Sequence, residues 1–259
     1  MKNHFYDIVP TLSGGNTAPN GGVEEIIFAD GTVWDRMDIT LKVSHPEDTD
    51  DTLTATDQVD FLDGGKGNDT LIGGNNSDVY VFGKDYGTDT INDRTDDVNI
   101  LIPSSDILMF RDGLTQDDVT FVRGANLSDL IIKISGSDDS ITIKNEFDAT
   151  YTGPFGTQWL SRVEHFSFDD GRTLNWNDII EQMNRDAGTD KDDTIIGFSY
   201  EDVLDGGKGN DYLSGGNEND TYRFGFGYGK DIIDENLDNI LSGNDDRVVF
   251  NADVKAALS

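Results

Sequence analysis

The 259-residue sequence contains no cysteine, so the chain can form neither disulfide bonds nor a thiol-based active site. A secreted protein without disulfides needs another source of rigidity, and a bound metal ion is the usual substitute. No run of 18 apolar residues occurs, so no membrane-spanning helix is expected. Residues 1–20 also lack a basic start followed by an apolar core, so no cleavable signal peptide is visible.

Basic residues are scarce, because 19 Lys and Arg face 51 Asp and Glu, which gives a formal net charge of −32. Nucleic-acid binding is excluded, since neutralising phosphates requires Lys and Arg. An anionic membrane would repel the same surface. Such an acidic excess is typical of a disordered chain, a salt-adapted protein or a binder of many cations. The 14 Phe, 8 Tyr and 3 Trp argue against disorder.

Signatures of catalysis are also missing from the sequence. It contains no H-E-x-x-H, no G-x-S-x-G elbow and no P-loop or dinucleotide fingerprint, and the EF-hand pattern is absent as well. His4, His45 and His165 lie far apart in the sequence and are expected at the surface or at strand edges. We therefore expect no enzymatic activity within these residues.

What the sequence does contain is a nine-residue repeat in two arrays. Residues 45–80 divide into HPEDTDDTL, TATDQVDFL, DGGKGNDTL and IGGNNSDVY, and residues 187–222 divide into AGTDKDDTI, IGFSYEDVL, DGGKGNDYL and SGGNENDTY. Every unit has Asp at its seventh position and a large apolar residue at its ninth. The two stretches that begin at Gly64 and Gly206 read G-G-x-G-x-D-x-U-x, in which U is a large apolar residue.

This spacing predicts a flattened solenoid in which a tight glycine turn alternates with a very short strand. Turns 18 residues apart would stack, and a cation between two turns would gather backbone carbonyls and two carboxylates. Such an all-oxygen environment of six to eight ligands suits Ca²⁺ and lacks the nitrogen or sulfur that Zn²⁺ prefers. The stacking pairs Asp51 with Asp69, Asp60 with Asp78, Asp69 with Asp89, Asp193 with Asp211, Asp202 with Asp220 and Asp211 with Asp231.

The predicted pairs correspond to about six Ca²⁺ ions if each site is built from two turns. The candidate carboxylate ligands are Asp51, Asp60, Asp69, Asp78, Asp89, Asp193, Asp202, Asp211, Asp220 and Asp231. The candidate ligands in the turns themselves are Gly64, Lys66, Asn68, Gly73, Asn75, Gly206, Lys208, Asn210, Gly215 and Asn217. Two carboxylates about 4 Å apart repel by roughly 4 kcal/mol at an effective dielectric of 20, so calcium binding should be coupled to folding.

Some units depart from the glycine pattern. Only two units in each array carry Gly-Gly at the expected place, so the first two turns of each array are expected to be wider. Asn76 and Glu218 replace the last glycine of the pattern. Asn tolerates the left-handed backbone that this position requires, and Glu does so less comfortably.

A longer repeat of roughly 140 residues surrounds the arrays. The stretch Val23–Gly31 recurs as Val163–Gly171, and Asp106–Phe110 recurs as Asp246–Phe250, each 140 positions later. Alternating apolar residues that end in Asp-Gly predict a strand and a tight turn. Asp35 and Asn175 then stand where the N-cap of a short amphipathic helix is expected.

Between the arrays, the patterns predict a strand at 106–110, a helical turn at 113–118, and antiparallel strands at 119–123, 129–134 and 140–143. The chain contains about 1.8 copies of the long unit, out of phase, which favours a fragment of a longer protein.

The predicted fold is all-β: two parallel β-rolls, separated and flanked by a small strand-rich element with one short helix. The predicted divisions are residues 1–43 (the end of one element), 44–93 (the first roll), 94–185 (a complete element), 186–235 (the second roll) and 236–259 (the start of the next element). The pattern leaves open whether the element continues the roll or forms a separate sandwich, and strands packed onto the ends of the rolls are favoured.

The two arrays resemble the hemolysin-type calcium-binding repeats of RTX proteins. The stretch Val-Glu-x-Ile-x-Phe-x-Asp-Gly resembles the hemolysin-type calcium-binding-protein-related domain that accompanies such repeats in large bacterial proteins. The resemblance implies a parallel β-roll, export by the type I secretion machinery, and folding in extracellular calcium, with the protein secreted or at the cell surface. The family's export signal is C-terminal, and none is evident in this sequence.

Three functions fit these observations. The first is a non-catalytic structural region of a large secreted RTX-type protein. The second is an adhesin-like module that binds a carbohydrate or cell surface through Trp34, Trp159, Trp176, Tyr151 and Phe155, although packing of these rings in a small core is the favoured interpretation. The third is an accessory C-terminal region of a secreted enzyme whose catalytic domain lies outside this sequence.

Overall fold

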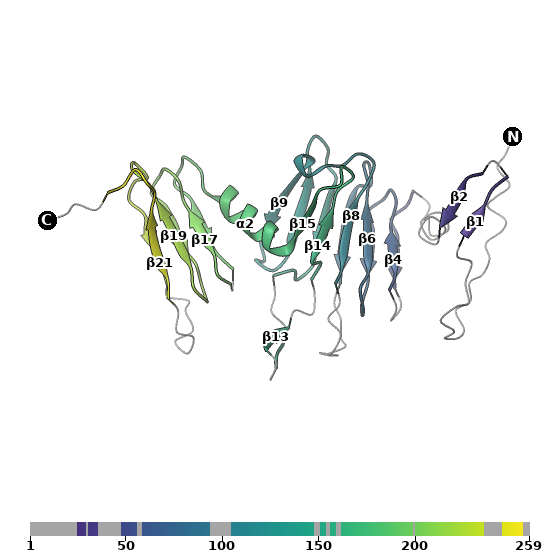
Figure 1. Cartoon of the computed structure of the whole chain (residues 1–259), viewed down its shortest axis with the longest axis horizontal. Helices are drawn as coiled ribbons and strands as arrows, with labels where there is room; N and C mark the ends of the chain where they lie inside the picture. The colour runs from purple at the N-terminus through teal and green to yellow at the C-terminus, as the bar shows by residue number, and fades with distance from the viewer. Residues whose placement is uncertain are drawn as a thin grey trace.

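The computed structural model describes residues 25–29, 31–35, 48–55, 59–93, 105–147, 151–153, 156–158, 162–198, 200–235 and 245–255. Within these residues most regular structure is β-strand, and successive strands stand side by side along the long axis of the molecule (Figure 1). The same residues contain no helix that is long and apolar enough to cross a membrane.

The first nonapeptide array forms a parallel β-roll, which we call roll 1. Its strands alternate between two facing sheets, so each strand pairs with the next but one in parallel. One sheet contains β3 (Thr52–Thr54), β5 (Thr70–Ile72) and β7 (Thr88–Asn92). The other contains β4 (Phe61–Asp63), β6 (Val79–Phe82) and β8 (Ile107–Phe110).

The strand register places the large apolar residues of successive units in columns between the two sheets. Leu53 pairs with Leu71 and Leu71 with Ile91 in one sheet. Tyr80, which pairs with Leu108 in the other sheet, is completely buried. The structure therefore confirms the prediction that the side chain at the ninth position of each unit points inward. These side chains form a core that is thin in the direction between the two sheets.

The second array forms roll 2, which has the same architecture. Its sheets contain β16 (Thr194–Ile196), β18 (Tyr212–Ser214) and β20 (Ile232–Ile233), and β17 (Val203–Asp205), β19 (Thr221–Phe224) and β21 (Arg247–Phe250). Its buried apolar core consists of Ile195, Leu204, Leu213 and Tyr222. Two parallel rolls were predicted from the sequence, and the structure confirms them.

The element between the arrays continues both sheets of roll 1. The strands β9 (Val119–Arg123), β10 (Leu130–Ile134) and β11 (Ser140–Ile143) form an antiparallel meander, and β11 pairs in parallel with β7. On the other side, β14 (His165–Ser167) pairs in parallel with β8 and antiparallel with β15 (Thr173–Asn175). The element thus extends the roll and does not form a separate sandwich.

The predicted turns and hairpins of this element are present. The 3₁₀ helix η2 (Gln116–Asp118) lies within the predicted helical turn, and His165 is exposed on β14. The hairpin of β1 (Glu25–Ile27) and β2 (Val33–Asp35) has the register of β14 and β15, 140 residues earlier. A further short hairpin joins β12 (Tyr151–Gly153) to β13 (Gly156–Gln158).

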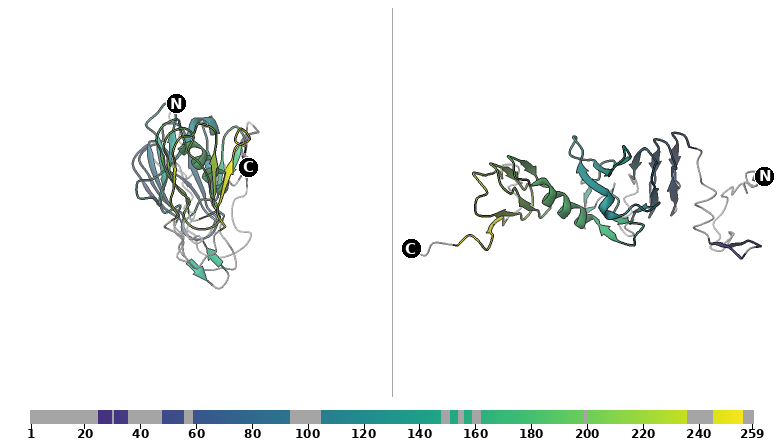
Figure 2. Two further views of the ribbon diagram at one scale, coloured as in Figure 1. Left: turned by 90° about the vertical axis from the view of Figure 1, so that its left-hand side faces the viewer. Right: turned by 90° about the horizontal axis from the view of Figure 1, so that it is seen from above.

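The helix α2 (Trp176–Ala187) connects the element to roll 2. Asn175 caps its N-terminus, as the sequence predicted. The structure adds that the side chains of Asn175 and Asp178 form a reciprocal capping box. The helix contacts β9 and β15 on one side and β17 on the other (Figure 2). The corresponding helix predicted after Asp35 lies outside the described residues.

The aromatic residues of the junction form part of the core. Trp176 is buried, its ring packs edge-on against Tyr200, and the guanidinium of Arg162 lies 3.7 Å from its centroid. Trp176 is therefore a core residue and not part of a carbohydrate-stacking surface. Trp159 and Phe155 lie outside the described residues, as do the side chains of Trp34 and Tyr151.

Because the core of roll 2 is so small, it should be sensitive to a single truncation. Leu213→Ala is expected to lower the free energy of unfolding by about 2–5 kcal/mol, since the cavity between two thin sheets cannot collapse without breaking the strand register. The control Val203→Thr keeps a β-branched side chain at a partly exposed position of the same roll and should change stability by less than about 1 kcal/mol. Urea unfolding in calcium would measure both, and equal effects would contradict this account of the core.

Candidate metal centre

The turns of each roll place Asp carboxyl groups in columns that run along the roll. Most turns end in an Asp that directly precedes a strand, as Asp69 precedes β5 and Asp78 precedes β6, whereas Asp89 is the second residue of β7. Because successive strands alternate between the two sheets, successive Asp residues also alternate between two columns. Each column therefore contains the Asp of every second nonapeptide.

Backbone hydrogen bonds connect neighbouring Asp residues of a column. The N–H of each Asp donates to Oδ1 of the Asp in the adjacent turn, over donor–acceptor distances such as 2.8 Å from Asp51 to Asp69 and 2.9 Å from Asp69 to Asp89. All six predicted pairs are neighbours of this kind. The remaining four are Asp60 with Asp78, Asp193 with Asp211, Asp202 with Asp220 and Asp211 with Asp231.

Two further members of the columns were not predicted. The N–H of Asp78 donates to Asp106 at 2.6 Å, and the N–H of Asp220 donates to Asp246 at 2.8 Å. Sequence separations of 28 and 26 residues place these pairs outside the repeat of 18. The signal that could have found them is an Asp directly before the strands Ile107–Phe110 and Arg247–Phe250, the same arrangement as in the regular units.

Five of these carboxylates leave one oxygen buried and without a hydrogen-bond partner. They are Oδ2 of Asp69, Asp78, Asp89, Asp211 and Asp220, all in the part of the chain that the structure describes. Burial raises the pKa of Asp78 to about 6 and the pKa values of Asp89 and Asp220 to about 7, with neighbouring carboxylates contributing. A buried carboxylate oxygen without a donor is costly, and a cation would satisfy it.

The first glycine of each glycine-rich turn keeps the space beside the free oxygen open. A Cβ atom at Gly64 would collide with Oδ2 of Asp69, and one at Gly206 would collide with Oδ2 of Asp211. Gly73 and Gly215 lie in the same way against Asp78 and Asp220. Glycine is thus required at these positions because carboxylate and backbone approach each other closely, and the residues fit a small cation with oxygen ligands.

The substituted turn positions keep a positive φ, as the corresponding glycines do, although the angle is smaller. Asn76 has φ of 71° and Glu218 has φ of 73°, where the corresponding Gly67 and Gly209 also have positive φ. Both substitutions therefore preserve the turn, as expected for Asn and in spite of the weaker preference of Glu.

The predicted ligands between the glycines and the Asp lie at the rim of the turns. Lys66, Asn68, Lys208 and Asn210 are exposed, and Asn75 and Asn217 are half-buried. The side chain of Asn68 contacts Oδ1 of Asp50 in the preceding turn, and Asn210 contacts Asp192 in the same way. These residues thus connect adjacent turns, and a role for their carbonyl oxygens in metal binding stays a prediction.

In the glycine-poor turns at the start of each array, the Asp carboxylates have other hydrogen-bond partners. Oδ2 of Asp193 accepts hydrogen bonds from the N–H and the hydroxyl of Thr189 at 2.8 and 2.7 Å. Oδ2 of Asp202 accepts from the N–H of Phe198, and its Oδ1 accepts from Asn184 of α2 at 2.7 Å. Oδ2 of Asp51 accepts from the hydroxyl of Thr49. In these three Asp residues Oδ2 therefore accepts hydrogen bonds from the protein, whereas Oδ2 of the Asp residues in the glycine-rich turns has no donor.

We propose that calcium is held mainly where the glycine-rich turns stack, with Asp69, Asp78, Asp89, Asp211 and Asp220 as the principal carboxylate ligands. The bound ion would supply the positive charge that cancels repulsion within a column. Asp51, Asp60, Asp193, Asp202 and Asp231 would complete sites from the adjoining turns. The total of about six ions stays a prediction.

Comparison with known proteins agrees with this geometry. Residues 47–80 and 187–222 match the family model of the RTX calcium-binding nonapeptide repeat (4 copies). Residues 1–38 and 129–178 match the Haemolysin-type calcium binding protein related domain. The sequence is 31% identical over 129 residues to "Iron-regulated protein FrpA" of Neisseria meningitidis serogroup C, and this match covers 50% of the present chain and 10% of that relative.

Removing the central carboxylate of each roll should remove bound calcium. Asp69→Asn together with Asp211→Asn is expected to lower the number of ions by up to two per roll, because each of these Asp residues lies between two neighbours of its column. The control is Asp138→Asn, which removes one negative charge from an exposed residue outside the columns. Calcium titration by calorimetry would measure the stoichiometry, and an unchanged count would mean that the ligands are wrongly identified.

The raised pKa values predict opposite pH dependences with and without calcium. In the calcium-free protein, Asp78, Asp89 and Asp220 bind protons more tightly when folded than when unfolded. Their contribution to stability should therefore be lost as pH rises through about 6 to 7, and be fully present only below about 4. In the calcium-saturated protein, protonation would compete with the ion, so stability should fall as pH falls. Thermal melts of decalcified and calcium-loaded protein between pH 5 and 8 would compare the two trends, and a decalcified protein that is more stable at pH 8 would contradict the prediction.

Proposed function

We propose that this chain, which belongs to the RTX calcium-binding repeat proteins, is a calcium-folded structural region of a larger secreted bacterial protein. The observation that carries the proposal is the set of buried carboxylate oxygens without partners, which recurs at corresponding turns of both rolls. In the absence of a cation these turns would bring like charges together inside the protein. Calcium would therefore act as a part of the fold.

The composition supports a role outside the cell. With a net charge of −32, the calcium-free chain would repel itself and stay expanded, a state suited to passage through a secretion channel. Extracellular calcium would then fill the sites, and about six ions would cancel roughly 12 negative charges. Export by the type I machinery and a position at or beyond the cell surface are parts of this proposal.

A non-catalytic role is also part of the proposal. Most of the buried acidic residues of the rolls lie in repeated columns, and the hydrogen bonds between neighbours explain the arrangement of these columns without a substrate. The region would serve as a spacer that becomes rigid in calcium. An accessory role beside a catalytic domain elsewhere in the parent protein is compatible with such a spacer.

The adhesin alternative depends on exposed aromatic side chains. Trp176 does not contribute to such a surface, because its exposed fraction is 6%. Phe226, with an exposed fraction of 84%, is an aromatic side chain at the surface of roll 2. A glycan array with and without calcium would test this alternative, and calcium-dependent binding that Phe226→Ala abolishes would favour it.

The central test is a calcium titration of the decalcified chain followed by circular dichroism. We expect weak structure without calcium and a cooperative gain of β signal as calcium rises, with half-saturation of about 0.1–1 mM, the range of extracellular calcium modules. Mg²⁺ is the control ion, since its smaller octahedral shell should not fit turns that are built for more ligands. A spectrum and melting temperature that do not change when calcium is removed would contradict the proposed function.

A further inference from the structure

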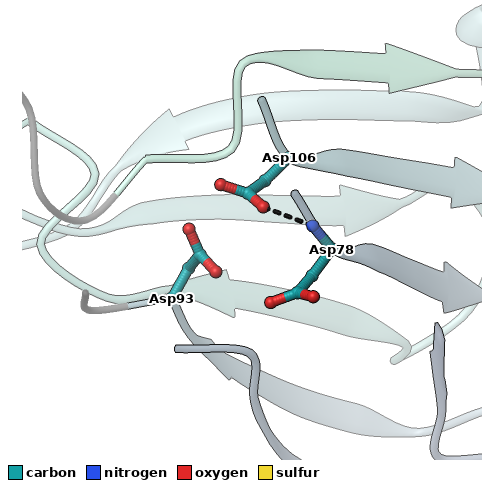
Figure 3. Close-up of side chains that lie close together, drawn as sticks. All are labelled: Asp78, Asp93 and Asp106. Carbon is teal, nitrogen blue, oxygen red and sulfur yellow. Dashed lines mark hydrogen bonds between the residues drawn. The ribbon is translucent and has the colours of Figure 1, made fainter. Parts of the chain in front are cut away.

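At the last glycine-rich turn of each roll, a third acidic side chain joins the column. We call these groups the roll 1 triad and the roll 2 triad. In each triad, one carboxylate oxygen from every residue lies within 4.8 Å of the other two. The roll 1 triad is Asp78, Asp93 and Asp106, which are shown in Figure 3, and the roll 2 triad is Asp220, Glu235 and Asp246.

The third residue enters from the sheet opposite to the column. Asp78 directly precedes β6 and Asp106 directly precedes β8, whereas Asp93 directly follows β7. After β5, the residue at this place is Gly73, so the regular turn brings only backbone to the site. Asp93 thus adds a carboxylate where the other turns have none, and Glu235 occupies the corresponding place in roll 2.

A tyrosine orients the added carboxylate in both rolls. The hydroxyl of Tyr80 donates to Oδ1 of Asp93, and the hydroxyl of Tyr222 donates to Oε1 of Glu235. These tyrosines occupy the large apolar position of their nonapeptides, and their exposed fractions are only 0% for Tyr80 and 1% for Tyr222. In each roll, a tyrosine of the core thus holds an acidic side chain in position by a hydrogen bond. The acidic residue is Asp in roll 1 and Glu in roll 2.

The space between the carboxylates is kept open by glycine. A Cβ atom at Gly73 would lie 2.6 Å from Oδ2 of Asp78 and 2.8 Å from Oδ1 of Asp93. Any side chain at this position would therefore fill the gap between the two groups. In Figure 3 the three carboxyl groups of the roll 1 triad converge on this common space.

An independent observation indicates that a ligand is needed there. The side chain of Asp78 has an exposed fraction of 0% and that of Asp220 a fraction of 1%, and Oδ2 of each has no hydrogen-bond partner. Within the described residues, no Lys or Arg forms an ion pair with Asp78 or Asp220. All three residues are buried in the roll 1 triad, whereas in the roll 2 triad only Asp220 is buried. Buried carboxylates at this separation require neutralisation by a cation or by protons.

We propose that each triad is a carboxylate-rich site for a divalent cation, in which Asp93 and Glu235 are ligands beside the Asp columns. Three carboxylates without nitrogen or sulfur favour a hard ion, and Ca²⁺ is the ion that the surrounding turns would also take. The site in roll 1 would join the last turn of the roll to the element, because the N–H of Asp106 donates to Glu164 next to β14 at 2.8 Å. The proposal rests on the calcium-folded role for its choice of ion.

The first test counts calcium in the full chain after Asp93→Asn, Glu235→Gln and the double substitution. Each single variant should lose one ion and the double variant two, while the other sites remain filled. Asp138→Asn, at an exposed position outside the triads, should leave the count unchanged. A full count in the double variant would overturn the triad sites, whereas a wild-type chain that binds no calcium would overturn the proposed function itself.

The second test uses Tb³⁺ as the probe, because tyrosine excitation transfers energy only to an ion that lies close to the ring. Tyr80 and Tyr222 contact the triads directly, so the wild-type chain should show tyrosine-sensitised emission that calcium displaces. The double variant Asp93→Asn with Glu235→Gln should lose most of this emission. Tyr80→Phe with Tyr222→Phe should also lower the emission, because these substitutions remove the tyrosine rings that contact the triads. Unchanged emission in the acidic double variant would show that protons, and not a cation, neutralise the triads.

Discussion

The stacking of aspartate carboxylates in desolvated turns is the constraint on which the rest of the structure depends. The N–H of one Asp donates to the carboxylate of the next, as from Asp51 to Asp69, and these bonds hold turns 18 residues apart in register. The second oxygen of Asp69 has no partner in the protein. The groups that align the turns therefore also repel one another, and a bound cation would remove this repulsion. We therefore expect folding and ion binding to be coupled in such an arrangement.

The thinness of the rolls explains why the strand-rich element is needed. The four buried residues of the roll 2 core form one small cluster, whereas the core of roll 1 runs on through the element to Phe198. The element achieves this because β11 and β14 pair in parallel with β7 and β8, so no sheet edge separates roll from element. The helix α2 then contacts β17, and the element connects two rolls that have little core of their own.

Much of this architecture could be predicted because a solenoid sets contacts by sequence period. When every ninth residue returns to an equivalent position, Asp60 and Asp78 are neighbours wherever the chain lies in space. The cap at Asn175 could be predicted for a similar reason, since it depends on residues within one turn of helix. The period does not predict neighbours where additional residues interrupt it. Asp106 and Asp93 follow such interruptions. Only the tertiary structure shows that their carboxylates lie close to that of Asp78.

The sequence by itself determined the nine-residue register, the alternation of the strands between two sheets, and the acidic residue in every turn, because these features depend on local spacing. Tertiary structure alone decided which carboxylate oxygens have partners. Asp202 and Asp220 occupy the same position of their units. Asn184 of α2 donates to Oδ1 of Asp202 and the N–H of Phe198 donates to its Oδ2, whereas Oδ2 of Asp220 has no donor. The physical reason is that a hydrogen-bond donor can arrive from any part of the chain that packing brings near, and a repeat pattern contains no information about such neighbours.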